Sequence, residues 1–201
     1  MRKTFWLIFL FVILGAAAVW LFILANKKNE YIISSSLPNT INKSIMKITS
    51  PKFENNQNIP PLYTCDGQGV NPPLEFSNVL KEAKSLALIL HDPDAPLAGG
   101  WTHWILWDIN PGVASIAENS VPAKATQGKT SSGQNNYGGP CPPTSKQGDL
   151  SGIHHYQFKL FALDIALKDL PSYSEKGDLE AAMNGHILEQ AVLVGLYSRV
   201  K

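Results

Sequence analysis

The 201-residue chain lacks the short motifs that mark several large enzyme classes. It has no Gly-x-x-x-x-Gly-Lys-Ser/Thr or Gly-x-Gly-x-x-Gly loop, so nucleotide hydrolysis and dinucleotide redox chemistry have no support in the sequence. A Gly-x-Ser-x-Gly elbow and a His-Glu-x-x-His pair are also missing, which argues against a serine hydrolase and a zinc peptidase. We therefore expect no cofactor.

Positive charge is scarce over most of the chain. Five basic residues and one acidic residue precede residue 47, so the remaining 12 basic and 15 acidic residues leave residues 47–201 with a net charge of −3. Nucleic-acid binding depends on clustered Lys and Arg that contact phosphates, and no basic run occurs in this region. The sequence predicts no nucleic-acid partner.

Cysteine is nearly absent, since Cys65 and Cys141 are the only two. They do not form a Cys-x-x-Cys pair, which argues against a structural zinc site. In an oxidising compartment the two can form one disulfide, but the sequence does not give their separation. A Cys65–Cys141 bridge and two semi-buried thiols are equally open alternatives.

The amino terminus is the one long stretch without charge. Thr4–Ala25 contains 22 uncharged residues flanked by basic ones, and a membrane-spanning helix needs roughly 20 apolar residues. We interpret residues 1–25 as an uncleaved signal anchor, with a cleaved signal peptide ending near Ala16–Ala18 as the alternative. Residues 26–46 are expected to form a tether. The domain at residues 47–201 is then expected outside the cytoplasm, in the periplasm, held to the membrane by this helix or exported.

Three segments of the domain have the pattern of strands. Ser85–Leu90 is a short continuous apolar run, as expected of a strand buried on both faces, and it leads into Asp92. In His103–Ile109 the alternation places His103 on the face of Ile105, Trp107 and Ile109.

The third segment, His154–Phe161, has the same two-residue period. It places His154 and Tyr156 together on an inward face and His155 toward solvent. Helical spacing predicts a helix in Glu175–Gln190. The strands do not alternate with helices, so the domain is expected to be mainly β with peripheral helices.

Polar side chains gather around these strands in a pattern that fits an anion site. His103, His154 and the Tyr156 hydroxyl can each donate a hydrogen bond, and backbone N–H groups near Gly139 can add more. Asp92 would repel an anion unless it pairs with a histidine or meets a cationic part of the ligand. The residues expected to wall the pocket are Asp94, Trp101, Tyr137 and Cys141, although Asp94 has an alternative role in ordering its own turn.

Four segments of the chain carry a family resemblance. They are Ile59-Pro-Pro-Leu-Tyr-Thr-Cys-Asp-Gly67; Asp92-Pro-Asp-Ala-Pro96 with Trp101-Thr-His103-Trp104; Tyr137-Gly-Gly-Pro-Cys-Pro-Pro143 with Gly152-Ile-His154-His155-Tyr156; and Met183-Asn-Gly-His186 with Val194-Gly-Leu-Tyr197. In this order they resemble the phosphatidylethanolamine-binding protein family, and within it the bacterial branch of Raf-kinase-inhibitor-like proteins. The resemblance covers residues 47–201.

The resemblance implies a fold and a site. It implies two packed antiparallel sheets and a pocket that binds small anions and phosphoryl head groups. The ligand-binding residues that the resemblance implies are Asp92, His103, His154 and Tyr156, and we expect Gly139 and Pro142 to shape the loop of the pocket. We expect a protein that binds a small phosphorylated or anionic group, with a phospholipid head group as one candidate. The alternative is a protein-interaction or inhibitor module, regulating a kinase or a protease, whose pocket is a regulatory site and whose partner is unknown.

Catalysis is not expected, and two enzyme alternatives stay open. Asp92, Asp94, His103 and His154 are residue types that could serve a metal-dependent hydrolase, although no metal is expected. Cys141 lies near two histidines that can lower a thiol pKa, so cysteine chemistry is the other alternative unless a disulfide abolishes it. The sequence leaves the natural ligand, the partner, the oligomeric state and the cleavage of the leader undetermined.

Overall fold

The computed structural model describes residues 21–24, 45–146 and 152–200. The chain divides into two units, residues 1–43 and residues 44–201. Most of the predicted membrane segment at residues 1–25 and of the predicted tether at residues 26–46 lies outside the described residues. Among the helices that the structure describes, none has the length and apolar character needed to cross a membrane.

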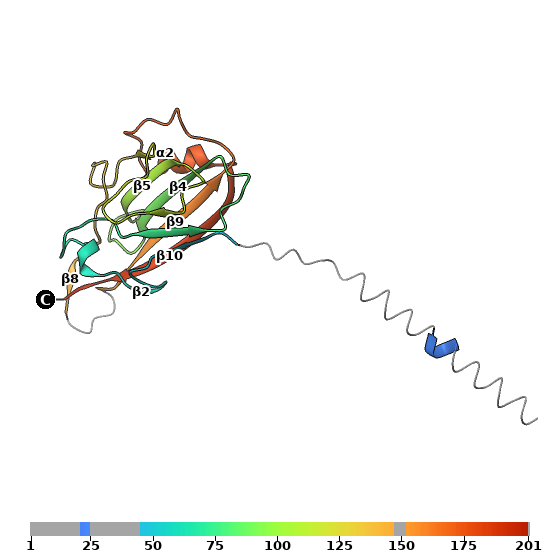
Figure 1. Ribbon diagram of the computed structural model, residues 1–201. Coiled ribbons are helices and arrows are strands. Elements are labelled where there is room, and N and C mark those ends of the chain that lie inside the picture. The colour runs from blue at the N-terminus through green and yellow to red at the C-terminus, as the bar shows by residue number, and fades with distance from the viewer. Residues whose placement is uncertain (1–20, 25–44, 147–151, 201) are drawn as a thin grey trace, which may run out of the picture. The chain divides into compact units, whose positions relative to one another are not determined.

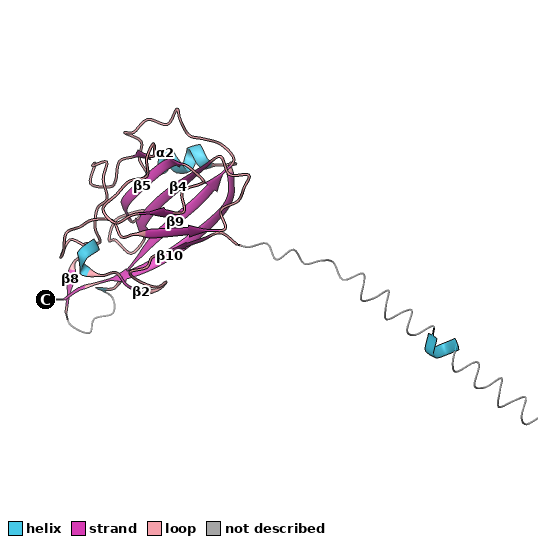
Figure 2. Cartoon of the chain, in the orientation of Figure 1, coloured by secondary structure: helices cyan, strands magenta, loops and turns pink. Residues whose placement is uncertain are grey.

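The second unit is mainly β, with few helices (Figures 1 and 2). Its strands are β1 (Lys47–Thr49), β2 (Gln57–Asn58), β3 (Leu74–Ser77), β4 (Ser85–Asp92), β5 (Trp101–Ile109), β6 (Ser115–Ile116), β7 (Thr126–Gln127), β8 (Thr144–Ser145), β9 (His154–Leu163), β10 (Ile187–Tyr197) and β11 (Arg199–Val200). The helices are a short 3-10 helix, η1 (Pro61–Tyr63), and α2 (Lys176–Met183). This confirms a mainly β domain.

The strands form one large sheet and two small ones. The large sheet has the order β2-β10-β9-β4-β5-β7, a second sheet has the order β1-β3-β6, and β11 pairs with β8. The expected antiparallel arrangement holds for most neighbours, but β2 pairs with β10 and β8 with β11 in parallel. These parallel partners are distant in sequence, so each short strand can reach its edge from either direction.

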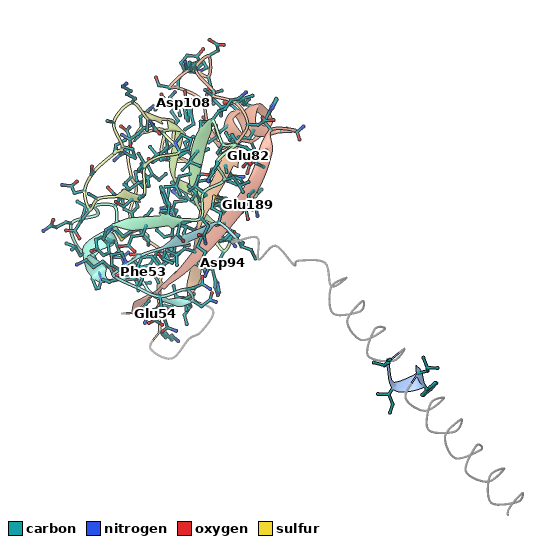
Figure 3. The ribbon with its side chains drawn as sticks, turned by 45° about the vertical axis from the view of Figure 1, so that its right-hand side comes forward. Phe53, Glu54, Glu82, Asp94, Asp108 and Glu189 are labelled. Carbon is teal, nitrogen blue, oxygen red and sulfur yellow. A yellow bond between two sulfur atoms is a disulfide. The ribbon has the colours of Figure 1, made fainter. Side chains whose placement is uncertain are left out.

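The main core lies between the six-stranded and the three-stranded sheets. Leu86, Leu88 and Leu90 of β4 point into it, while Ala87 and Ile89 point to a second cluster that α2 covers. All eight residues of β4 are therefore buried, as the continuous apolar run predicts. Charged side chains such as Glu54 and Glu82 lie at the surface (Figure 3).

A β-bulge in β5 turns His103 away from its predicted face. Leu90 pairs with Trp104 and His91 pairs with Thr102, so His103 is an extra residue without a partner in the register. The His103 ring lies 5.2 Å from the ring of Tyr156, which packs in the same core cluster as Trp104, while Ile105 packs in the other cluster. A second register shift, between the Leu88–Leu106 and Leu86–Ile109 pairs, puts Ile109 in the main core as well, whereas Trp107 packs with Ile105. The strict alternation predicted for His103–Ile109 is therefore wrong at both ends.

The predicted helix at Glu175–Gln190 is half as long as expected. Helix α2 ends at Met183, and Gly185 follows with φ of +81°, a left-handed conformation that favours glycine. The chain then enters β10 at Ile187, where an eleven-residue strand pairs with β9. Tertiary pairing overrides the helical spacing of the apolar residues here.

Candidate ligand-binding site

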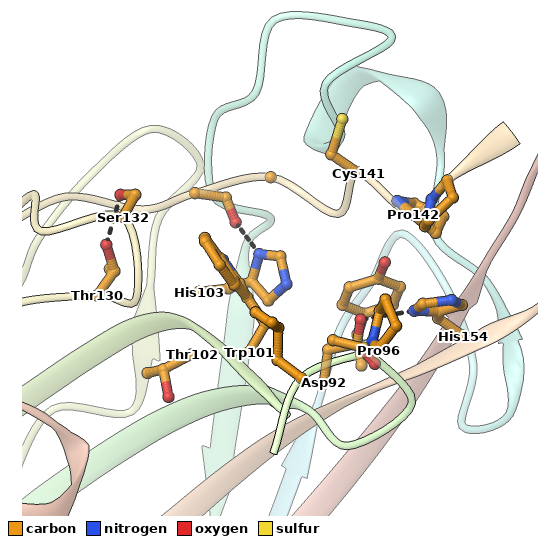
Figure 4. A pocket seen from close by; sticks show the side chains of 16 residues that line it. Asp92, Pro96, Trp101, Thr102, His103, Thr130, Ser132, Cys141, Pro142 and His154 are labelled. Carbon is orange, nitrogen blue, oxygen red and sulfur yellow. Dashed lines mark hydrogen bonds and ion pairs between the residues drawn. The ribbon is translucent and has the colours of Figure 1, made fainter. Parts of the chain in front are cut away.

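An open cavity of about 530 Å³ lies where the end of β4 meets the starts of β5 and β9 (Figure 4). Its lining comes from these strands, from the loop between β4 and β5, and from the long loop between β7 and β8. The lining residues are Asp92, Ala95, Pro96, Leu97, Trp101, Thr102, His103, Thr130, Ser132, Gly138, Gly139, Cys141, Pro142, Pro143, His154 and Tyr156. All six residues predicted to contact a ligand or shape its loop line this cavity.

Asp92 and His154 form a buried pair at one side of the cavity. Nδ1 of His154 lies 2.7 Å from Oδ2 of Asp92, and both side chains are less than 10% exposed. The other carboxylate oxygen of Asp92 accepts a hydrogen bond from the backbone N–H of Asp94 at 2.9 Å. The carboxylate thus holds the imidazole in one orientation, which is the first of the two roles expected for Asp92.

His103 lies on the other side of the cavity and is held by the pocket loop. Its Nδ1 donates to the carbonyl oxygen of Gly138 at 2.9 Å. Burial lowers the pKa of His103, and the hydrogen bond to Gly138 and the charge of Asp92 offset this only in part. Because Nδ1 is already bonded to the Gly138 carbonyl, His103 can offer a ligand only its Nε2 atom.

The Tyr156 hydroxyl is buried beneath the cavity without a hydrogen-bond partner among the described residues. Asp92 and the Cys141 backbone lie near it, but neither meets the distance and angle of a hydrogen bond. Burial, with the charge of Asp92 next in size, raises the pKa of Tyr156 well above its usual range, so the hydroxyl keeps its proton. The Tyr156 ring stacks near the His154 ring, with centroids 6.3 Å apart. A buried unpartnered hydroxyl beside an open cavity fits a group that a ligand satisfies.

The loop at residues 138–143 is fixed on both sides. A disulfide joins Cys141 to Cys65, and the Cys65 backbone N–H donates to the Pro140 carbonyl at 3.1 Å. The Gly138 N–H, one of the backbone donors expected near Gly139, donates to the His103 carbonyl and is therefore not free for a ligand. Cys141 lines the cavity as a disulfide sulfur, which removes the free thiol that cysteine chemistry requires.

Asp94 does not line the cavity, although it was predicted as a possible wall. Its carboxylate accepts hydrogen bonds from the backbone N–H of His155 at 2.8 Å and from the His155 Nδ1 at 2.7 Å (Figure 3 shows Asp94). Burial alone would raise the pKa of Asp94, but these hydrogen bonds outweigh it and lower the pKa. The turn after β4 is ordered by Asp92 rather than by Asp94. Asp94 thus pairs with His155 at the surface.

Tyr137 also stands outside the cavity, behind the loop it was expected to wall. Its ring packs edge-on against Trp104 with centroids 5.6 Å apart, and its hydroxyl donates to the Tyr63 carbonyl at 2.9 Å. Tyr63 belongs to η1, the helix next to Cys65. Tyr137 therefore supports the same loop connection as the disulfide.

The sequence did not single out several residues of the cavity. Pro96 and Leu97 form a lip after β4, and the Leu97 side chain is 55% exposed. Thr130 and Ser132 hydrogen-bond to each other earlier in the loop that carries residues 138–143. The proline-rich turn after Asp92 was a signal for the lip, but nothing in the sequence places residues 130–132 beside it. In the part of the chain that the structure describes, no group of three His, Cys, Asp or Glu residues is placed to hold a metal ion.

A sequence profile described as phosphatidylethanolamine-binding protein matches residues 49–198 of this chain. That range contains every residue of the cavity. The chain belongs to the phosphatidylethanolamine-binding protein family.

Relatives in the family are found in archaea and bacteria. The chain is 43% identical over 163 residues to UPF0098 protein PH1269 of Pyrococcus horikoshii, which covers 78% of each protein. It is 44% identical over 159 residues to a UPF0098 protein of Methanothermobacter thermautotrophicus, which covers 77% of this chain and 99% of that protein. These names give the relatives no activity.

Two solved structures of the family have a similar fold. CT736 of Chlamydia trachomatis, described as a homolog of phosphatidylethanolamine-binding protein, is 40% identical with a TM-score of 0.70, over 77% of this chain and 98% of that one. YbcL of Escherichia coli, described as a member of the mammalian family, is 27% identical with a TM-score of 0.71, over 79% and 100%. The two-sheet architecture is therefore that of phosphatidylethanolamine-binding proteins.

Proposed function

We propose that the cavity binds a small phosphorylated or otherwise anionic group, and that the protein acts by binding rather than by catalysis. A phospholipid head group or a phosphorylated side chain has the chemistry that fits. The observation that carries this proposal is the buried Tyr156 hydroxyl, which has no partner among the described residues and lies next to the His154–Asp92 pair. The name of the family, which specifies phosphatidylethanolamine, supports it.

The arrangement explains how an anion can bind near a carboxylate. Asp92 already accepts hydrogen bonds from His154 and from the Asp94 backbone, so part of its charge is satisfied within the protein. When His154 is protonated the pair is neutral, and Nε2 of His154 can donate to a ligand oxygen. The Tyr156 hydroxyl adds a second donor, and two donors converge on one space.

Calorimetric titration of the full-length chain with phosphoethanolamine tests this function. We expect saturable binding that falls at least roughly tenfold when His154→Ala and Tyr156→Phe are combined, because both donors are lost. His155→Ala is the matched control, since His155 follows His154 on β9 but is exposed and outside the cavity. Unchanged affinity in the folded double variant would refute the proposal. A protein partner that still binds the double variant stoichiometrically would favour an inhibitor module.

We also propose that the domain works outside the cytoplasm, tethered or exported through residues 1–25. The disulfide supports this, because both cysteines are exposed and such bonds persist mainly in oxidising compartments. Carbonate extraction of membranes, with protease accessibility in intact and opened cells, distinguishes a tethered from a released protein. Recovery of reduced protein in the cytosol would contradict the proposal.

A further inference from the structure

The hydrogen bond between His103 and Gly138 fixes the tautomer of the imidazole. A backbone carbonyl can only accept, so the Nδ1 of His103 must carry the proton that it shares with the Gly138 oxygen. In a neutral imidazole the other nitrogen then has a lone pair and no proton. Nε2 of His103 is thus a hydrogen-bond acceptor whenever the ring is neutral.

The surroundings of His103 keep the ring neutral. The residue is 6% exposed, and its hydrogen-bond partner is an uncharged carbonyl rather than a carboxylate. Of the titratable groups that face it, Asp92 favours the charged ring, His91 and His154 oppose it, and Tyr156, whose ring lies 5.2 Å away, stays uncharged. The effect of burial on the pKa of His103 is larger than that of any of these charges, and it lowers the pKa. The ring is therefore neutral at pH values at and above the ordinary histidine pKa.

His103 Nε2 has no hydrogen-bond partner among the described residues, and the side chain lines the cavity. Figure 4 shows His103 and His154 on opposite sides of the space below Cys141 and Pro142. A ligand between them meets the acceptor of His103 on one side and, on the other, the Tyr156 hydroxyl, a donor that lies beside His154. The cavity therefore has mixed polarity rather than a uniform set of donors.

We propose, on the basis of the proposed function, that the cavity selects oxyanions that carry a proton of their own, and so takes a protonated phosphoryl group while excluding sulfate. A P–OH group can donate to Nε2 of His103 while another oxygen accepts from the Tyr156 hydroxyl. Sulfate has the same tetrahedral shape but no proton at neutral pH, so it faces the His103 lone pair with an oxygen. A bound sulfate would leave the lone pair of His103 Nε2 without a donor, which weakens binding by roughly 10- to 100-fold.

The same chemistry separates two sources of phosphoryl ligand. Inorganic monohydrogen phosphate has a P–OH, whereas the phosphodiester of a lipid has none and must supply its donor from elsewhere, such as the ammonium of ethanolamine. Dimethyl phosphate represents a diester without any donor. We expect glycerophosphoethanolamine to bind and dimethyl phosphate not to bind if the lipid head group is the source.

The experiment is a calorimetric comparison of phosphate, sulfate, dimethyl phosphate and glycerophosphoethanolamine on the full-length chain at about pH 8, where phosphate and sulfate are both dianions and only phosphate has a proton. We expect phosphate to bind roughly 10- to 100-fold more tightly than sulfate. Equal binding of the two overturns the selectivity and leaves the proposed function standing. If phosphate and glycerophosphoethanolamine both fail to bind, the proposed function itself is refuted, and this inference with it.

A second measurement assigns the selectivity to His103. Nitrogen NMR of the histidine-labelled protein is expected to show a neutral His103 with a bare Nε2, whose signal shifts when phosphate binds but not when sulfate is added. In His103→Gln the side-chain amide can present either a donor or an acceptor, so the ratio of phosphate to sulfate affinity should fall toward one. A protonated Nε2 in the unliganded protein, or an unchanged ratio in a folded His103→Gln, overturns the assignment.

Discussion

His103 and Gly138 hold each other by two hydrogen bonds in opposite directions. Nδ1 of His103 donates to the Gly138 carbonyl at 2.9 Å, and the Gly138 N–H donates to the His103 carbonyl at 2.8 Å. The bulge in β5 and the disulfide-linked loop are thereby joined at the edge of the cavity. The position of the loop thus determines the orientation of the imidazole.

Gly139→Ala is expected to destabilise the protein by about 1–3 kcal/mol and to weaken ligand binding. A Cβ atom at Gly139 would lie 2.9 Å from the carbonyl carbon of Thr64 and 3.0 Å from the carbonyl oxygen of Tyr63. Both are backbone atoms, which cannot move aside as a flexible side chain can. Gly138→Ala is the matched control, because its Cβ would meet its nearest atom, the His103 carbonyl oxygen, at an ordinary 3.4 Å. Chemical denaturation and phosphate titration of both variants check this, and equal losses would show that crowding against Thr64 is not the cause.

Asp92→Ala is expected to cost about 2–4 kcal/mol of unfolding free energy. The change leaves the His154 Nδ1–H and the Asp94 backbone N–H without their acceptor in a buried region. Asp94→Ala removes an analogous pair with His155 at the surface and should cost less than about 1 kcal/mol. Urea denaturation of the two variants at one pH measures the difference, and a larger loss for Asp94→Ala would contradict the ranking.

Stability is expected to fall as the pH decreases below about 6.5, the ordinary histidine pKa. Burial holds the pKa of folded His103 below that of the unfolded chain, so in this window the unfolded state binds more protons and acid favours it. The contribution of His103 is at most about 1.4 kcal/mol at pH 5.5. Denaturation of His103→Gln should show a shallower loss between pH 7.5 and 5.5. His91 is also buried, with a pKa lowered in the same direction, so the variant should retain part of the slope.

The sequence predicted the parts of the cavity that depend on one strand at a time. The two-residue period of β9 correctly put His154 and Tyr156 on the buried face and His155 outside. The apolar run of β4 correctly led to a buried Asp92. These assignments need only the local alternation of side chains and the ends of the apolar runs.

The sequence could not predict features that depend on register between distant segments. The orientation of His103 depends on a bulge that exists only in the pairing of β5 with β4. Thr130 and Ser132 reach the cavity through a loop whose path no periodicity records. Tyr137 lies in the predicted motif but packs behind it, because its hydroxyl finds the Tyr63 carbonyl. Sequence motifs thus located the cavity but not which of their side chains face it.

Replacing both cysteines, as Cys65→Ser with Cys141→Ser, is expected to lower the unfolding free energy by about 4 kcal/mol. The bond closes a loop between residues 76 positions apart, and the stabilisation from such closure grows with loop length. Because Cys141 lines the cavity and the adjacent Pro140 carbonyl is held by the Cys65 N–H, the variant should also bind phosphate more weakly. Denaturation and phosphate titration with and without a dithiol reductant measure both effects. The reductant should lower both the stability and the phosphate affinity of the wild-type chain and change neither in the double variant. If full reduction leaves the affinity of the wild-type chain unaffected, the hydrogen bonds of Gly138 and Cys65 suffice to hold the loop.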